Sequence, residues 1–180
     1  MRIYTDASSR GNISGIAYVV TDARDRKVHD EGKIFPKGDN NTAELEAIRL
    51  ALCFSQDKAG LLKLGIDPDE RFVILTDSSY AINAIRFGVC RETEKDLVTE
   101  IKDRLSSQRA HLMWIKGHCQ DGTILSYYNK CADKLSKRTR KNEEKGRRAH
   151  KHKLQKEALR NGFLTQPGGL YFHNGRDYAL

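Results

Sequence analysis

Acidic side chains follow apolar, β-branched runs at two places in the chain, and these acids are the residues best suited to chemistry. The first run is Ile3-Tyr4-Thr5, followed by Asp6, and the second is 73–76, followed by Asp77. Val, Ile, Thr and Tyr favour strands, so each run predicts a strand that delivers a carboxylate. Sites in open α/β sheets form beyond the carboxyl ends of strands, so we expect Asp6 and Asp77 to meet.

Two further acids extend this set. Glu44 lies in the first turn of a predicted helix, where the helix dipole favours an anion, and Asp133 lies in the last predicted helix. Crowded carboxylates cannot all stay ionised unless a cation neutralises them. Oxygen ligands favour Mg²⁺ or Mn²⁺ over zinc, and two such ions about 4 Å apart would clamp the attacking water and the leaving oxygen of a phosphodiester. The set therefore predicts metal-dependent phosphodiester hydrolysis.

A histidine, His118, follows Gly117 at the start of a long loop, where it could shuttle protons or help the product leave. Simpler roles exist for each residue alone. An acid at a strand end is more commonly a helix or turn cap, and His118 could merely hydrogen-bond within its loop. The spacing of His118, Cys119 and Cys131 does not match ordinary structural zinc sites. The ordered set, not any single member, supports the catalytic interpretation.

Hydrophobic periodicity predicts the elements that position these residues. Short polar connections between the first three strands indicate an antiparallel meander, and strands alternate with helices thereafter. This order predicts an α/β fold with a mixed sheet and helices on both faces. The expected strands are 2–5, 15–20, 28–35, 71–76 and 110–116; the expected helices start at Thr42, cover 78–87 and 92–105, and restart at Asn129, with an irregular helical insertion over 55–70.

The positive charge belongs to one segment. The 180 residues carry a net charge of +8, but 134–160 alone holds 12 Lys and Arg against three Glu, a local charge of +9. The remainder has 20 basic and 21 acidic residues, a charge of −1. This segment is polar nearly all round, which is typical either of a solvated, partly frayed helix or of an arm that engages phosphates with salt-dependent affinity.

We predict a catalytic domain over 1–137, a basic helical extension over 138–160 and a tail over 161–180. The tail could form a small hairpin around Asn174-Gly175, stay disordered or dock a partner. No apolar run approaches the roughly 20 residues that cross a bilayer, and the N-terminus lacks a signal-peptide pattern. With four cysteines and no Cys-x-x-Cys pair, we expect a cytoplasmic monomer with reduced thiols and no membrane contact.

Five motifs, in order, resemble type 1 ribonuclease H over roughly residues 1–137. They are Thr5-Asp6-Ala7-Ser8, 40–47 (NNTAELEA), 75–82 (LTDSSYAI), 114–118 (WIKGH) and 129–133 (NKCAD). The resemblance implies the ribonuclease H-like fold, a five-stranded mixed sheet with an antiparallel meander of strands 1–3 and then parallel strands 4 and 5. It also implies hydrolysis of the RNA strand of RNA–DNA hybrids to 5′-phosphate and 3′-hydroxyl ends.

The resemblance also assigns residues to roles. It implies two Mg²⁺ ions, with Mn²⁺ as a substitute, and His118 as the histidine of a mobile loop. An enzyme indifferent to sequence should contact 2′-hydroxyls and groove shape, not base edges. The implied metal ligands are Asp6, Glu44, Asp77 and Asp133; the implied substrate contacts are Ser8, Asn12, Asn40, Asn41 and Ser79.

Three departures from the family pattern stand out. Ala7 replaces the usual glycine after the first aspartate, a small change that should still permit close approach. The stretch 119–128 is longer than the usual loop, which affects the placement of His118. The basic handle helix of some bacterial members is absent, because 87–90 simply bridges two helices; the segment 134–160 is a candidate replacement.

Two alternative functions stay open. The first is a nucleic-acid-binding module of the same fold that has lost turnover, although a pure binder gains nothing from anions crowded beside phosphates. The second is another nuclease of the superfamily, such as a recombination nuclease or a proofreading exonuclease. The exonucleases that resemble this fold carry Asp-x-Glu on the first strand, whereas Ser8 stands two residues after Asp6.

Overall fold

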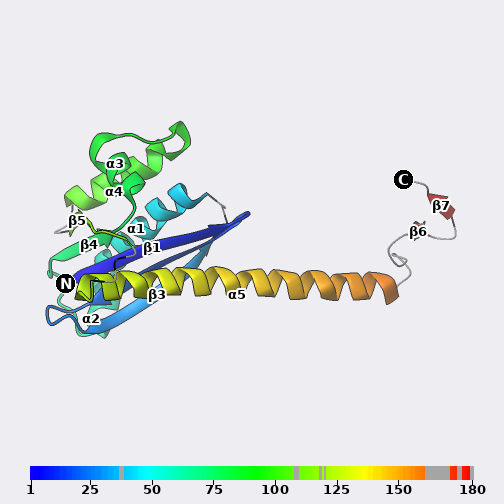
Figure 1. Ribbon diagram of the computed structural model, residues 1–180, viewed down its shortest axis with the longest axis horizontal. Coiled ribbons are helices and arrows are strands. Elements are labelled where there is room, and N and C mark those ends of the chain that lie inside the picture. The colour runs from blue at the N-terminus through cyan, green and yellow to red at the C-terminus, as the bar shows by residue number, and fades with distance from the viewer. Residues whose placement is uncertain are drawn as a thin grey trace. The chain divides into compact units, whose positions relative to one another are not determined.

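Five strands between Arg2 and Trp114 form one mixed sheet (Figure 1). The computed structural model describes residues 1–36, 39–107, 110–117, 119, 121–160, 171–173 and 176–178. The strands are β1 (Arg2–Arg10), β2 (Ile13–Thr21), β3 (Lys27–Phe35), β4 (Phe72–Thr76) and β5 (Ala110–Trp114). Their order is β3-β2-β1-β4-β5; β1, β2 and β3 are antiparallel, and β4 and β5 are parallel to β1. This confirms the predicted α/β sheet.

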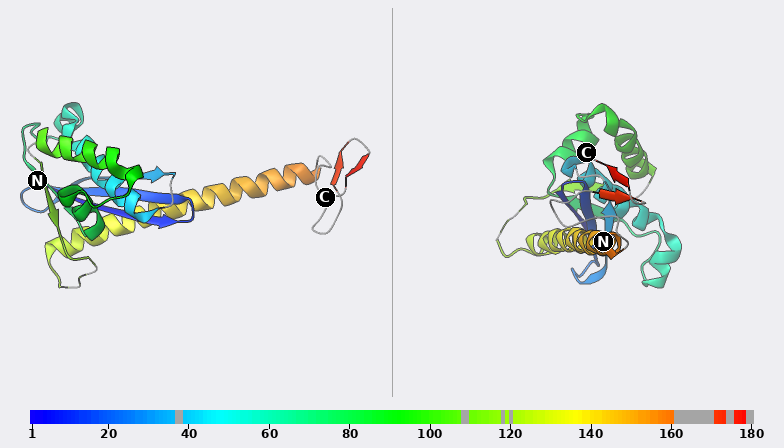
Figure 2. Two further views of the ribbon diagram at one scale, coloured as in Figure 1. Left: turned by 90° about the horizontal axis from the view of Figure 1, so that it is seen from above. Right: turned by 90° about the vertical axis from the view of Figure 1, so that its right-hand side faces the viewer.

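Helices cover both faces of this sheet, as predicted, and Figure 2 shows α3 and α4 on the opposite side from α5. The helices are α1 (Asn40–Gln56), α2 (Lys58–Lys63), α3 (Ser79–Phe87), the 3₁₀ helix η1 (Glu92–Glu94), α4 (Lys95–Ser107) and α5 (Ile124–Arg160). Across the described ranges, none of them combines the length and apolarity that a membrane span requires.

The alternation of side chains along β1 explains which face each residue serves. Ile3 packs with Leu45 of α1 in the largest core cluster, whereas Tyr4 packs with Leu135 of α5 in a second cluster. Successive strand residues point to opposite faces, so Tyr4, Asp6 and Ser8 all face α5. Asp6 contacts Ser136 of α5, and Ser8, two residues further along the strand, contacts Arg140, four residues further along the helix. The two spacings match because two strand residues advance about 6.6 Å and four helix residues about 6 Å.

Two glycines let α5 lie close against the sheet. A Cβ on Gly15 of β2 would lie 2.2 Å from the backbone oxygen of Ser136, and one on Gly32 of β3 would lie 2.3 Å from Oγ1 of Thr139. Neither separation is possible for real atoms: a larger residue at position 15 would push the helix backbone outward, and one at position 32 would at least displace the Thr139 side chain. This close approach places the side chains of α5 within reach of Asp6.

Several boundaries differ from the predicted ones. β1 continues to Arg10, because its pairing with β2 runs as far as Arg10↔Ile13; Asp6 therefore lies inside a strand and not at its end. α5 starts at Ile124 instead of Asn129, since the hydroxyl of Thr123 accepts from the Ser126 N–H and caps an added turn. The predicted insertion at 55–70 is the end of α1 and the short α2, separated by Asp57, which caps α2.

The chain divides into two units, Met1–Lys141 and Asn142–Leu180. The first continues past the predicted boundary at 137 because Arg140 is buried and its Nε donates to Oγ of Ser8, 3.1 Å away. In the second unit the helix continues to Arg160, and β6 (Tyr171–His173) pairs with β7 (Arg176–Tyr178) in an antiparallel ladder. The predicted turn residues 174–175 lie outside the described residues.

Candidate active site

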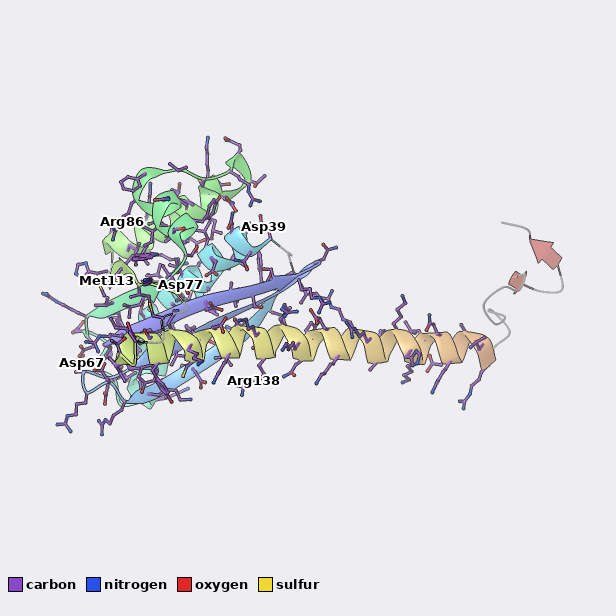
Figure 3. The ribbon with its side chains drawn as sticks, in the orientation of Figure 1. Asp39, Asp67, Asp77, Arg86, Met113 and Arg138 are labelled. Atoms are coloured by element: carbon purple, nitrogen blue, oxygen red, sulfur yellow. The ribbon has the colours of Figure 1, made fainter. Side chains whose placement is uncertain are left out.

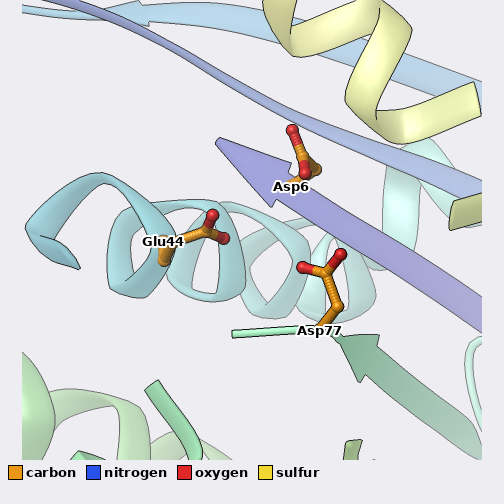
Figure 4. Close-up of side chains that lie close together, drawn as sticks. All are labelled: Asp6, Glu44 and Asp77. Carbon is orange, nitrogen blue, oxygen red and sulfur yellow. The ribbon is translucent and has the colours of Figure 1, made fainter. Parts of the chain in front are cut away.

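Three carboxylates from three separate elements converge at one point of the first unit (Figure 4). Asp6 comes from β1, Glu44 from α1, and Asp77 directly follows β4. One oxygen of each lies within 4.8 Å of the others. Asp6 and Glu44 are each only 6% exposed, while Asp77 is partly exposed. The cluster is thus a buried acidic site open on the Asp77 side.

The divergence of two strands explains why Asp6 and Asp77 meet. The parallel pairing of β1 with β4 runs only to Tyr4↔Leu75, and the Thr5 hydroxyl donates to the Leu75 carbonyl oxygen, 3.1 Å away. Beyond this point β4 ends, while β1 continues along β2. The side chain of Asp77 therefore enters the space beside Asp6 that a longer β4 would have filled.

Glu44 differs from its predicted setting. It lies in the second turn of α1, and Asp39 caps the helix by accepting from the Asn41 N–H at 3.0 Å. Glu44 is therefore no partner of the helix dipole. Burial, followed by the charges of Asp6 and Asp77, raises its pKa well above the ordinary value, and hydrogen bonds from Ala7 and Asn40 only partly oppose this.

The environment of Asp6 also disfavours its charge. Burial is the largest cause that raises its pKa, from 3.8 to about 7; the charges of Asp133 and Asp77 add to it, and a hydrogen bond from the buried Ser136 hydroxyl opposes it. Without a cation, the Asp6 and Glu44 carboxyls thus bind protons more tightly than free carboxyls do. A bound divalent cation would remove this penalty by supplying positive charge.

The polar atoms of the site fit a hard metal ion. Oε2 of Glu44 and Oδ1 of Asn129 are buried, and neither has a hydrogen-bond partner within the part of the chain that is described. Buried oxygens without a partner are costly, which points to a ligand that satisfies them. A set of carboxylate oxygens is the donor chemistry that Mg²⁺ and Mn²⁺ prefer. The residues present therefore fit a divalent cation.

The other predicted catalytic residues stand apart from this cluster. Asp133 projects from α5, close enough to raise the pKa of Asp6, but its Oδ1 lies 2.6 Å from Nζ of Lys137 and it is not among the three converging carboxylates. His118 lies outside the described residues. The described cluster is thus three of the four predicted carboxylates, with the fourth nearby.

The predicted substrate contacts occupy different settings. Asn40 is exposed and Asn41 half-buried at the start of α1, and Asn12 is exposed in the turn between β1 and β2. Ser79 is exposed as the first residue of α3, whose N-cap is Ser78. By contrast, Ser8 is buried and its hydroxyl accepts from Arg140. Its side chain is therefore engaged within the protein.

Two residues that touch the carboxylates had no predicted role. Nδ2 of Asn129 donates to Oδ2 of Asp77 at 3.0 Å, and Ser136 contacts Asp6. Both lie one helical turn from Asp133, at i−4 and i+3, so they share its face of α5. That spacing is the signal by which the sequence could have identified them. A third group, Gly117, is required to be small, because a Cβ there would lie 2.5 Å from Oδ2 of Asp77.

A buried acid, Glu94 of η1, links the elements that carry the candidate substrate contacts. It is 1% exposed and accepts from the Thr42 hydroxyl at 2.6 Å, the Tyr80 hydroxyl and the Arg91 N–H at 3.2 Å. Burial alone would raise its pKa, but these hydrogen bonds outweigh burial and lower it. Arg91 also pairs with Asp39, the cap of α1. The starts of α1 and α3 are thereby joined to η1.

The sequence of the first unit matches a family model described as RNase H over residues 1–141. The chain belongs to the RNase H family. Membership identifies this protein as a ribonuclease H enzyme and confirms the resemblance seen in its motifs. No curated protein matches the chain.

Solved structures of RNase H1 enzymes share the fold of this RNase H. LC11-RNase H1, isolated from compost by a metagenomic approach, is 23% identical with a TM-score of 0.62, covering 78% of this chain and 95% of that one. The structure of the same enzyme in complex with an RNA/DNA hybrid is 22% identical with a TM-score of 0.62, and the match covers 78% of this chain and 96% of that one. RNase H1 from the halophilic archaeon Halobacterium salinarum NRC-1 is 17% identical, with a TM-score of 0.58, covering 77% and 95%.

Proposed function

We propose that this RNase H cuts the RNA strand of RNA–DNA hybrids internally and leaves 5′-phosphate and 3′-hydroxyl ends. The observation that carries the proposal is the buried cluster of Asp6, Glu44 and Asp77, with one oxygen of Glu44 that no described group satisfies. LC11-RNase H1, which shares the fold, has been solved in complex with an RNA/DNA hybrid. A fixed acidic cluster of this kind suits a metal-assisted phosphodiester hydrolase.

Asp6, Glu44, Asp77 and Asp133 are the residues proposed to hold two Mg²⁺ ions, with Mn²⁺ as a substitute. When bound, such ions polarise the scissile phosphate and lower the pKa of an attacking water. The chain's own contribution is to hold the carboxylates in place: Asn129 fixes Asp77, Ser136 fixes Asp6, and Gly117 leaves room for the Asp77 side chain. His118 is proposed as a proton shuttle on the basis of the sequence motif.

Substrate recognition is assigned to the exposed starts of α1 and α3 and to the β1–β2 turn. Asn40, Asn41, Ser79 and Asn12 would contact the sugar edges and phosphates of the hybrid, which allows recognition by shape. Ser8 belongs to the same set of predicted substrate contacts, but its hydroxyl accepts a hydrogen bond from Arg140. The basic segment 134–160 would add phosphate contacts. We further propose that the enzyme acts as a monomer, and that it works in the cytoplasm, a compartment in which its four free cysteines would stay reduced.

A cleavage assay tests the proposal. An RNA–DNA hybrid labelled at the RNA 5′ end is incubated with the full chain and Mg²⁺, then with Mn²⁺, and the ends of the products are mapped. We expect internal cuts that leave 3′-hydroxyls, and loss of at least about 1,000-fold in kcat for Asp77→Asn, because the cluster acts as a unit. Asp103→Asn, on the exposed side of α4, is the matched control and should retain full activity.

Two outcomes would count against the proposal. An intact hybrid in the presence of both metals would exclude ribonuclease H turnover under those conditions. Tight hybrid binding that Asp6→Asn does not change, with no cleavage, would instead indicate a binding module of the same fold.

A further inference from the structure

A groove lies on the flank of α5 that faces β2 and β3. Tyr127, Cys131, Lys134 and Arg138 follow one another at i, i+4, i+7 and i+11 and so form one stripe of the helix. Between this stripe and Val19 of β2 is a cavity of about 470 Å³. Asn129, Asp133 and Ser136, which serve the carboxylates, belong to the other flank. In the view of Figure 3, the labelled side chains of Asp77 and Arg138 lie on opposite sides of α5.

The rim of this groove is cationic. Lys134 and Arg138 are exposed, and within the described ranges neither makes an ion pair or a hydrogen bond. A third cation, Lys27 of β3, has its Nζ 3.3 Å from Oδ2 of Asp30, an acid that also lines the groove. Two cations free of partners beside a single, already paired acid give the groove a positive potential. A ligand with negative charges would complement it.

One wall of the groove is aromatic and held in place. Tyr127 is 60% exposed, and its ring packs edge-on against Tyr128, with centroids 5.0 Å apart and an interplanar angle of 82°. Tyr128 in turn packs against Tyr4, 5.4 Å away, and its hydroxyl donates to the Asp25 carbonyl oxygen at 2.7 Å. The protein thus presents a supported aromatic face to solvent beside its two unpaired cations.

We propose that this groove binds a single-stranded segment of nucleic acid, with Lys134 and Arg138 on successive phosphates and one base stacked on Tyr127. A cationic groove with an exposed aromatic ring is the usual combination for single strands, because every base has a π-face. A duplex would meet the cations equally well, but its bases are already stacked on one another and cannot reach the ring. The aromatic wall therefore favours an unpaired strand.

This site is distinct from the carboxylate cluster, since the two use opposite flanks of α5. It suits a hybrid that carries a single-stranded overhang, whose paired part lies at the carboxylates. The inference extends the proposed function to a second ligand and does not depend on turnover. Its test can therefore use DNA alone, without a divalent metal.

Fluorescence anisotropy of a labelled 12-nucleotide DNA strand, with the full chain in EDTA, measures the binding. The variant Lys134→Gln/Arg138→Gln should bind at least tenfold more weakly. The slope of log K against log salt should become shallower by about 1.4, because each phosphate contact on a single strand contributes about 0.7. Lys58→Gln/Lys63→Gln, two exposed lysines of α2, removes the same charge elsewhere and should change the affinity less than twofold.

Stacking is tested separately from charge. Tyr127→Leu should weaken binding of the single strand five- to tenfold, while Tyr127→Phe should stay within twofold, because it keeps the ring and loses only the hydroxyl. Phe87→Leu, at an aromatic that is 72% exposed at the end of α3, is the control. Urea denaturation of each variant shows whether it is folded.

The affinities of these variants decide whether the groove binds a single strand. Equal affinities for the Lys134/Arg138 and Lys58/Lys63 variants would overturn the site, because net charge alone would then explain binding. If Tyr127→Leu binds like the wild type, or loses as much affinity for a blunt DNA duplex as for the single strand, the single-strand assignment is wrong. Absence of hybrid cleavage would refute the proposed function and leave this inference untouched.

Discussion

Burial of the Asp6 carboxyl in the acidic cluster lowers the stability of the folded protein when no metal is bound. Its pKa is raised from 3.8 to about 7, chiefly by burial and then by Asp133 and Asp77. The folded state therefore binds a proton more tightly than the unfolded state does. Stability must fall as pH rises through the window between these two values, and the loss is complete above about pH 7.

Asp6→Asn should therefore stabilise the metal-free protein. The amide keeps the shape and a group that can contact Ser136, but it has no charge to bury. In EDTA we expect the free energy of unfolding to rise by about 1–3 kcal/mol at pH 8, with the gain shrinking toward zero near pH 4. Urea titrations at several pH values measure this. Asp103→Asn, exposed on α4, should show no such pH-dependent gain; a gain at Asp6 that does not vary with pH would contradict the electrostatic explanation.

Gly117 sets the position of Asp77 from the other side. A Cβ there would lie 2.5 Å from Oδ2 and 3.1 Å from Cγ of Asp77, so Gly117→Ala must displace the carboxylate or the loop. We expect kcat on the hybrid to fall at least about tenfold, because small misplacements of catalytic groups are costly. Gly146→Ala, where a Cβ meets nothing within 4 Å, is the control. Unchanged kcat in Gly117→Ala would mean that Asp77 tolerates the shift.

At the scale of elements, Glu94 holds the starts of α1 and α3 together through Thr42 and Tyr80. Glu94→Gln introduces an N–H₂ group where three donors converge, and we expect it to cost about 1–3 kcal/mol of stability. Because Glu94 supports Asn40, Asn41 and Ser79 but touches no carboxylate of the cluster, hybrid KM should rise several-fold while kcat stays within about twofold. Steady-state kinetics on the hybrid measure both.

The neighbouring Glu92 supplies a matched control. Its side chain is 82% exposed and, among the described residues, pairs only with Lys95, so Glu92→Gln should leave both stability and KM almost unchanged. A fall in kcat without a rise in KM for Glu94→Gln would show that η1 acts on the carboxylates, contrary to this assignment.

The sequence predicted the sheet and the converging acids, because strand runs and polar turns are local signals. It placed Asp6 at a strand end, however, because the sequence does not show that β1 continues along β2 to Arg10 after its pairing with β4 has ended at Tyr4. It also missed Ser136 and Glu94, whose roles depend on contacts 130 and 52 residues away along the chain. Helical spacing from Asp133 is a local signal for Ser136, but Glu94 has no such signal, so its tertiary contacts alone identify it.

At the scale of the whole chain, Arg140 fixes where the catalytic unit can be cut. It is buried in the first unit, where it donates to Ser8 and packs against Gly15 of β2, so a chain that stops at 137 loses both the bond and this packing. A chain that stops at Lys141 retains it. We expect 1–141 to unfold at the same urea concentration as the full chain, and 1–137 to be less stable by about 1–3 kcal/mol.

The truncated chain 1–141 also tests the basic segment. Residues 142–160 contribute seven Lys and Arg against three Glu, so their removal takes away phosphate contacts without touching the carboxylates. Hybrid KM should rise several-fold at low salt, its dependence on salt should become shallower, and kcat should stay within about twofold. Steady-state kinetics between 50 and about 200 mM salt measure all three. A KM that matches the full chain at every salt concentration would mean that the segment binds no hybrid, whereas a fall in kcat would place it in the chemistry.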